Sequence, residues 1–97
     1  MLTGKQRSYL RGLANTIPAI FQVGKNGIDE NVIRQFKEAL EARELVKASV
    51  LKNSLYSARE AGEEIAQAID ADVVSVVGSK FVLYRESKNN KVLNLPD

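Results

Sequence analysis

The sequence predicts a single α/β domain with the element order α-β-α-β-α-β-β and a mixed four-stranded sheet with helices. Apolar residues recur with the helical period of about 3.6 residues in three segments, and runs rich in β-branched residues separate these segments. The last two runs, residues 73–77 and 80–85, flank a Gly-Ser pair, which is typical of a hairpin. A chain of 97 residues has room for one hydrophobic core, so we expect residues 1–97 to form one domain.

The first helix is predicted over residues 5–15 and the first strand over residues 19–23. Thr3 followed by Gln6 is a capping-box pattern, which indicates where the helix begins. Pro18 ends the helix, because proline lacks an N–H group and pushes the residue before it out of the α region. The apolar run after Pro18 then has the composition of a strand.

The second helix is predicted over residues 29–42, with Asp29 as its N-cap and with Glu41 on the side that faces water. The second strand is predicted over residues 45–51. In this strand Val46, Ala48 and Val50 alternate with Lys47 and Ser49, so the two sets are expected on opposite faces of the sheet.

The third helix is predicted to end at Ile69 and to begin after Ser57, whose spacing to Glu60 is a second capping-box pattern. Ser54 is an alternative start. The order of the strands stays open at this stage, so the second and third helices could cover the same face of the sheet or opposite faces. Residues 86–97 are predicted to be a polar C-terminal tail that docks by Leu93 and Leu95.

The absence of cysteine and histidine restricts the chemistry of this chain. It excludes disulfides and thiolate chemistry, and it removes the usual zinc ligands and the commonest general base. The sequence contains neither a dinucleotide-binding fingerprint nor a Walker loop. We therefore expect no enzymatic activity, no cofactor and no metal.

The chain also lacks the patterns that direct a protein to a membrane. No apolar run approaches the roughly 18 residues that a membrane span needs, and the first residues do not form the apolar core of a signal peptide. We expect a cytoplasmic protein with no membrane partner.

The formal net charge is only +2, but the charges are unevenly distributed. The first 28 residues contain four basic residues and no acidic one: Lys5, Arg7, Arg11 and Lys25. Residues 60–72, in contrast, are rich in acid and contain no base. A basic segment of this kind favours contact with a polyanion, although a solvated helix face or chance segregation in a small protein would give the same pattern.

The stretch Gly24-Lys25-Asn26-Gly27 is the principal candidate site. It lies between a predicted strand and a predicted helix, and its two glycines allow a ligand to approach the backbone closely. We also expect the N-terminus of the following helix to favour an anion there. A plain connection between a strand and a helix would have the same spacing, but the basic segment before it favours an RNA phosphate as the ligand. K-homology RNA-binding modules contact the nucleic-acid backbone with a GXXG loop, and this parallel concerns the loop alone.

Most of the aromatic residues lie within apolar stripes, so we expect them in the core. Tyr56, in the connection before the third helix, is the one that we expect to be exposed. Base stacking is therefore not predicted.

Four blocks of the sequence together resemble the free-standing bacterial members of the CRM domain family, the YhbY type. They are Leu2-Thr3-Gly4-Lys5-Gln6-Arg7, Gln22-Val23-Gly24-Lys25-Asn26-Gly27-Ile28, Glu38-Ala39-Leu40-Glu41-Ala42-Arg43-Glu44-Leu45-Val46-Lys47 and Val76-Val77-Gly78-Ser79-Lys80-Phe81-Val82-Leu83-Tyr84-Arg85. The blocks occur in order between residues 2 and 85. Residues 51–71 depart from the family pattern, so no partner-specific contact is carried over to them.

The resemblance implies an RNA-binding α/β domain similar in fold to the C-terminal domain of translation initiation factor three. It also implies a role, since bacterial members of the family associate with precursors of the large ribosomal subunit. Related domains in plant organelles act in group II intron splicing. The GxxG loop of the family falls on Gly24 to Gly27 of this chain.

We therefore expect a non-enzymatic protein that binds RNA, the large-subunit ribosomal RNA or its precursor, and assists assembly of the large (50S) subunit. The residues expected to contact RNA are Gly24, Lys25, Asn26, Gly27, Lys5, Arg7 and Arg11. Lys47, Lys80 and Arg85 are weaker candidates, because charged residues also keep strand ends soluble. The alternative is an adaptor that reaches ribosomal precursors through a ribosomal protein, by its acidic third helix or its tail, without direct RNA contact.

Overall fold

The structure is a computed structural model that describes residues 2–97. The helices and strands follow the predicted order, and each boundary lies within one residue of a predicted one. They are α1 (Gly4–Ala14), β1 (Ala19–Val23), α2 (Glu30–Arg43), β2 (Leu45–Val50), α3 (Ala58–Ile69), β3 (Asp72–Val77) and β4 (Lys80–Tyr84). In the part of the chain that the structure describes, no helix is long and apolar enough to cross a membrane.

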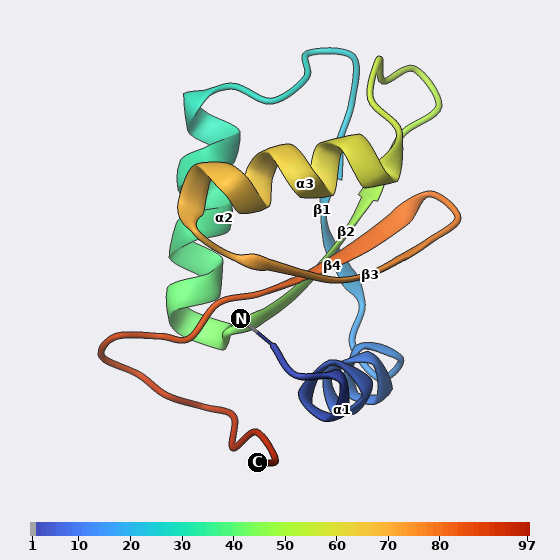
Figure 1. Ribbon diagram of the computed structural model, residues 1–97. Helices are drawn as coiled ribbons and strands as arrows, with labels where there is room; N and C mark the ends of the chain where they lie inside the picture. Colours follow the sequence, from blue (N-terminus) through green and yellow to red (C-terminus); the bar gives the residue numbers. More distant parts are fainter. Residues whose placement is uncertain (1) are drawn as a thin grey trace.

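The four strands form one mixed sheet in the order β1-β2-β4-β3. Strands β1 and β2 are parallel, and β4 runs antiparallel to both of its neighbours, β2 and β3. Strands β1, β2 and β3 therefore run in the same direction, and their carboxyl ends lie at the same end of the sheet. Figure 1 shows α2 and α3 on one side of the sheet and α1 on the other, which resolves the question that the sequence left open.

The larger hydrophobic cluster lies between the sheet and helices α2 and α3. The ring of Phe36 packs between those of Phe21 and Phe81, at centroid distances of 4.7 and 6.0 Å. Gly62 of α3 lies directly on Phe81, since a Cβ at position 62 would come within 3.2 Å of that ring. The absence of a side chain at this position lets α3 approach the sheet.

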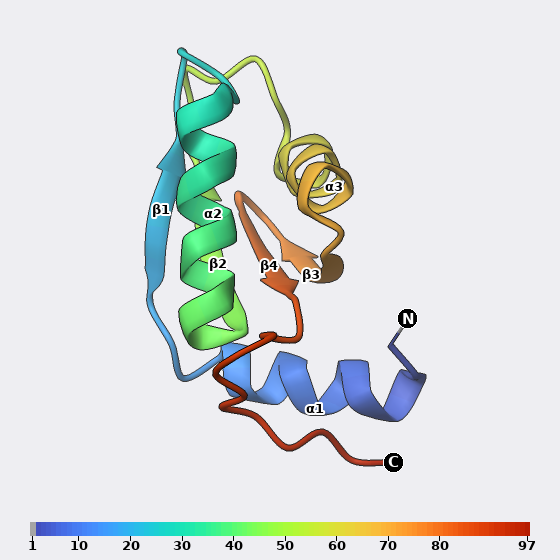
Figure 2. The same ribbon diagram turned by 90° about the vertical axis from the view of Figure 1, so that its left-hand side faces the viewer.

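A second cluster lies on the opposite face of the sheet, beneath α1. Leu10 and Ala14 of α1 are buried there. Leu93 and Leu95 of the tail pack against the same cluster, so the predicted docking of the tail is confirmed. Gln6 donates a hydrogen bond to the carbonyl of Pro96 (3.0 Å), and the tail runs beside α1 (Figure 2).

Both predicted capping boxes are present, at the starts of α1 and α3. The side chain of Ser57 accepts from the N–H of Glu60, and the Glu60 carboxylate accepts from the N–H of Ser57. Ser54, the alternative start of α3, instead accepts from the N–H of Tyr56 at 3.0 Å. It therefore belongs to the preceding turn, and α3 begins after Ser57.

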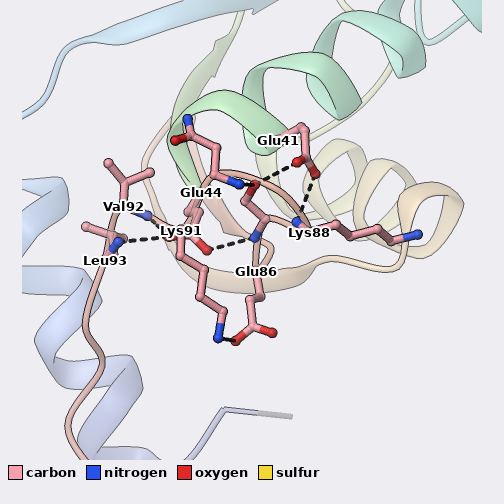
Figure 3. Close-up of polar contacts among 9 residues, drawn as sticks. Glu41, Glu44, Glu86, Lys88, Lys91, Val92 and Leu93 are labelled. Atoms are coloured by element: carbon pink, nitrogen blue, oxygen red, sulfur yellow. Dashed lines mark hydrogen bonds and ion pairs between the residues drawn. The ribbon is translucent and has the colours of Figure 1, made fainter.

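Glu44, between α2 and β2, is completely buried and anchors the tail (Figure 3). Its carboxylate accepts hydrogen bonds from the N–H groups of Ser87, Val92 and Leu93 at 2.7–2.8 Å. Its own backbone ends α2 in the left-handed region, with φ of 65°. The main chain and the side chain of one residue thus connect the end of a helix to a segment more than 40 residues further on.

Glu41, one turn earlier in α2, was expected to face water but binds the tail as well (Figure 3). Its carboxylate accepts from the hydroxyl of Ser87 (2.7 Å) and from the N–H groups of Lys88 and Asn89 (3.2 and 3.1 Å). Its position on the polar side of the helix hid this role. These contacts hold the pKa of Glu41 below its usual value, with the Ser87 hydroxyl as the main cause.

Burial by itself would raise the pKa of Glu44, because it disfavours the charged form. The N–H groups of Ser87, Leu93 and Val92, together with the charge of Lys91, outweigh this effect and leave the pKa lowered. The carboxylate is therefore charged when the tail is bound.

We predict that Glu44→Ala lowers the free energy of unfolding by about 2–3 kcal/mol, because it leaves three N–H groups of the tail without an acceptor. Both residues have a Cβ, so the strain of the left-handed backbone stays the same. Urea denaturation measures the change. Glu38→Ala, at an exposed position of the same helix, is the control and should stay within about 0.5 kcal/mol of wild type. Equal stability of Glu44→Ala and Glu38→Ala would contradict the anchoring role.

We also predict that acid releases the tail. Glu41 and Glu44 have lowered pKa values in the folded state, so their stabilisation is complete above the ordinary value of 4.5 and is lost as the pH falls through the folded-state values. The unfolding free energies of wild type and of the double variant Glu41→Gln, Glu44→Gln should therefore converge as the pH falls. Denaturation at a series of pH values measures this, and a constant difference down to about pH 3 would disprove it.

Candidate nucleic-acid interface

The candidate loop at residues 24–27 is a tight turn at the carboxyl end of β1. The N–H of Gly27 donates to the carbonyl of Gly24 at 3.0 Å, and Gly27 has a φ of +73°, in the region that favours glycine. Lys25 and Asn26 lie at the tip, and both are exposed. An ammonium and a carboxamide in this position can both donate hydrogen bonds to an anion.

The connection between β2 and α3 supports this loop from behind. The N–H of Leu51 donates to the carbonyl of Val23 (2.9 Å), and a Cβ at Gly24 would lie 3.4 Å from the side chain of Leu51. A Cβ at Gly27 would lie 3.5 Å from the ring of Tyr56. Residues of the connection between β2 and α3 therefore hold the loop in place.

Tyr56 was expected to be exposed, but it is half-buried beside Gly27, and its hydroxyl donates to Glu64 at 3.3 Å. The negative charge of Glu64 is the main reason why the pKa of Tyr56 is raised. Tyr9, expected in the core, is instead the more exposed ring, at 39%. The apolar spacing of α1 includes Tyr9, but the buried residues of this helix are Leu10 and Ala14.

Two acidic residues lie at the N-terminus of α2, where we expected an anion to be favoured. The carboxylate of Asp29 already accepts from the N–H of Val32 at 2.9 Å, and Glu30 adds a second negative charge in the first turn. Both carboxylates partly neutralise the positive end of the helix dipole. Lys25, at the tip of the loop, can attract an anion at this end of the molecule.

The basic residues of α1 are in different environments. Lys5 and Arg11 are exposed, whereas Arg7 is half-buried and its guanidinium donates to the carbonyls of Val73 and Val74 on β3. The pairing of β3 with β4 is irregular between residues 73 and 75, and Arg7 satisfies the carbonyl groups at this bulge. Sequence spacing gives no signal for this contact, because 66 residues separate the donor from its acceptor.

The loop and the basic helix are not adjacent. Figure 2 shows the loop beyond the upper end of β1 and α1 beyond its lower end. The five residues of β1 span about 17 Å at the usual rise per residue. A ligand that contacts both must therefore extend along the sheet.

No group of His, Cys, Asp and Glu side chains within residues 2–97 could hold a metal ion. The site consists of backbone, amide and cationic groups at the edge of a mixed sheet. Chemically, these groups can bind an anion by charge and hydrogen bonds.

The fold and the site define a small α/β domain with a GxxG loop. Residues 2–85 match the family model of the CRS1 / YhbY (CRM) domain, and the chain belongs to this family. The resemblance seen in the four sequence blocks is thereby confirmed, and membership agrees with the expectation that the chain is not an enzyme.

Relatives of similar length match almost the whole chain. It is 47% identical to Probable RNA-binding protein YqeI of Bacillus subtilis, over 99% of this chain and 100% of the relative. An RNA-binding protein of Haemophilus influenzae is 31% identical, over 94% of this chain and 92% of the relative. The solution structure of SAV1595 from Staphylococcus aureus has a TM-score of 0.72 and 48% identity, over 99% of this chain and 100% of that one.

Gly27→Ala should destabilise the protein by about 1–2 kcal/mol, the usual cost of a left-handed backbone conformation for a residue with a Cβ. The Tyr56 ring leaves room for the added methyl group, so backbone strain is the main effect. Gly12→Ala is the matched control. It lies inside α1 with open space around it, and it should stabilise by about 0.5–1 kcal/mol. Thermal unfolding measures the stability of both variants. Shifts of the melting temperature with the same sign would contradict the left-handed conformation of Gly27.

Proposed function

We propose that this chain is a non-enzymatic RNA-binding protein that binds large-subunit ribosomal RNA, or its precursor, and assists assembly of the large ribosomal subunit. The observation that carries this proposal is the turn at residues 24–27, which presents Lys25 and Asn26 to solvent on a rigid base. A flexible loop would have to be ordered on binding, at a cost in entropy, whereas hydrogen bonds and the contacts of Leu51 and Tyr56 hold this turn.

Each residue of the loop has a distinct role in the proposal. Gly24 and Gly27 allow the RNA backbone to come close to the protein backbone. Lys25 neutralises a phosphate, and Asn26 donates a hydrogen bond to a phosphate or a sugar. These contacts are independent of sequence, so they fix the position of the RNA rather than select its bases.

The basic residues of α1 extend the surface for RNA in the proposal. Lys5 and Arg11 are exposed and add affinity that falls with salt. Arg7 is less free to contact RNA, because its guanidinium is already bound to carbonyl groups of β3.

Two similarities support the choice of RNA and of the ribosome. The relatives from Bacillus subtilis and Haemophilus influenzae carry RNA binding in their names. The sequence blocks resemble the free-standing bacterial type, whose members associate with precursors of the large subunit. The proposed role in assembly of the ribosomal subunit depends on this resemblance, whereas the proposal that the ligand is RNA depends also on the loop.

We predict that Lys25→Glu weakens binding to large-subunit ribosomal RNA by at least about tenfold at moderate salt and makes the salt dependence shallower, because one phosphate contact is lost. The unfolding free energy should change by no more than about 0.5 kcal/mol, since Lys25 is exposed. Fluorescence titration of labelled RNA across a salt series measures the affinity.

Lys88→Glu is the control for net charge, because Lys88 is exposed and belongs to the segment bound at the far end of α2. It should bind RNA nearly as wild type does. In cells, wild type should sediment with precursors of the large subunit and Lys25→Glu should not. If wild type binds no naked RNA at any salt concentration but still sediments with the precursors, the adaptor alternative replaces direct RNA contact.

A further inference from the structure

The face of the sheet opposite α2 and α3 is only partly covered. α1 and the tail pack on the half that contains Leu45 and Tyr84. The other half, toward the edge that carries the loop at residues 24–27, has no helix over it (Figure 1). The pairing of the strands determines which side chains lie next to one another on this half.

The strand pairing gives two rows of side chains on this open half. In the row nearest the loop, Gln22 pairs with Ser49, Ser49 with Lys80, and Lys80 with Val77. Gln22 and Lys80 are exposed, and Val77, the last residue of the edge strand β3, is 75% exposed. The row therefore offers an amide, a hydroxyl, a cation and an apolar surface side by side.

In the next row, toward α1, Lys47 pairs with Val82 and Val82 with Ser75. These residues lie on the floor of a groove whose wall is α1. The groove is lined by Arg11, Asn15, Lys47, Ser75, Val77 and Lys80, among others. Arg11 and Asn15 reach it from α1, so the groove continues the surface of the basic helix.

The charge on the half of this face toward the loop has one sign. α1, β1, β2 and β4 contain no acidic residue, and Asp72 of β3 is at the first position of its strand, far from the loop edge. Arg11, Lys47 and Lys80 therefore act together on a ligand in the groove without a neighbouring carboxylate to offset them.

We propose, building on the RNA binding proposed for the loop, that this open sheet face binds a single-stranded RNA segment running from the loop to α1. Lys80, Lys47 and Arg11 bind successive phosphates along the path. Gln22, Ser49, Ser75 and Asn15 donate to and accept from the edges of unpaired bases or the 2′-hydroxyl groups. The face thus supplies the path between two sites that lie at opposite ends of β1.

A single strand fits this face better than a duplex. Two of the polar groups on this face belong to short side chains: Ser75 lines the groove beside α1, and Ser49 lies in the row nearest the loop. Bases turned out from a single strand can reach such groups, whereas the base edges of a duplex stay inside its grooves. The aromatic rings of β1 and β4 do not provide a stacking platform, because Phe21 and Phe81 face α2 and α3 and Tyr84 is buried in the cluster beneath α1. Val77 instead offers an apolar contact to a base.

The test compares the double variant Lys47→Ala, Lys80→Ala with the double variant Lys37→Ala, Lys88→Ala, which removes the same charge from exposed positions outside this face. The probe is a single-stranded oligouridylate of about 10 nucleotides, with an RNA duplex in parallel. The first variant should bind the single strand at least about tenfold more weakly, and its plot of log K against log salt should be shallower by about 1.4, which corresponds to two phosphates. The control should bind nearly as wild type does.

A measurement on the wild-type protein does not depend on how the variants fold. Addition of the oligouridylate should shift the backbone amide signals of Gln22, Ser49 and Lys80 in nuclear magnetic resonance spectra and leave those of α3 in place. Shifts confined to residues 24–27 and α1 would overturn the path across the sheet.

The outcomes separate this proposal from the proposed function. If Lys25→Glu weakens RNA binding but Lys47→Ala, Lys80→Ala does not, the path is wrong and the loop still binds RNA. Equal binding of the duplex, with the same loss in the variant, would refute the single-strand preference. If wild type binds no RNA of any kind, both proposals fall together.

Discussion

The buried carboxylate of Glu44 is the contact on which the arrangement of the chain depends. The main-chain carbonyl of Glu44 accepts a hydrogen bond from the N–H of Arg85 (3.0 Å), just after β4, and the side chain of Glu44 binds the tail. A buried charge and a left-handed backbone at a residue other than glycine are each unfavourable, by about 1 kcal/mol or more. They persist because three N–H groups of the tail compensate the charge. Leu93 and Leu95 are consequently held on the cluster beneath α1, which completes the second core.

The contacts that stabilise the fold and the loop that is proposed to bind RNA lie at opposite ends of β1. The anchoring contacts lie at the end of the sheet where α2 finishes, and the GxxG loop lies at the end where α2 begins (Figure 2). The loop is supported by Leu51 and Tyr56, so its shape does not depend on a bound ligand. An exposed substitution at Lys25 therefore changes what the loop can bind without loosening the core, whereas a change at Glu44 acts on the core and leaves the loop chemistry intact.

The sequence was sufficient for features that depend on neighbouring residues. Local signals such as the capping boxes, Pro18, the alternation in β2 and the Gly-Ser pair of the hairpin predicted the elements to within one residue, and the glycine spacing predicted the loop. The contacts that it could not predict join distant segments and leave no period: Glu41 to Ser87, Arg7 to β3, and Gly27 to Tyr56. Glu41 has the spacing of an exposed helix residue, and only the tail reveals its function. The strand order was open for the same reason, because several orders satisfy the same local patterns.

The distribution of charge also decides which face of the molecule can meet a polyanion. α3 carries Glu60, Glu63 and Glu64, and of these Glu63 pairs with Arg59 at 3.6 Å on an exposed surface, where such a pair changes the local field little. Glu41 and Glu44 are enclosed by the tail. The cations of α1 and of the open sheet face have no such neighbours on their own elements. A net charge of only +2 therefore hides an uneven distribution, with the acidic helix α3 and the basic helix α1 on opposite faces of the sheet, and this distribution favours a polyanion on the α1 face.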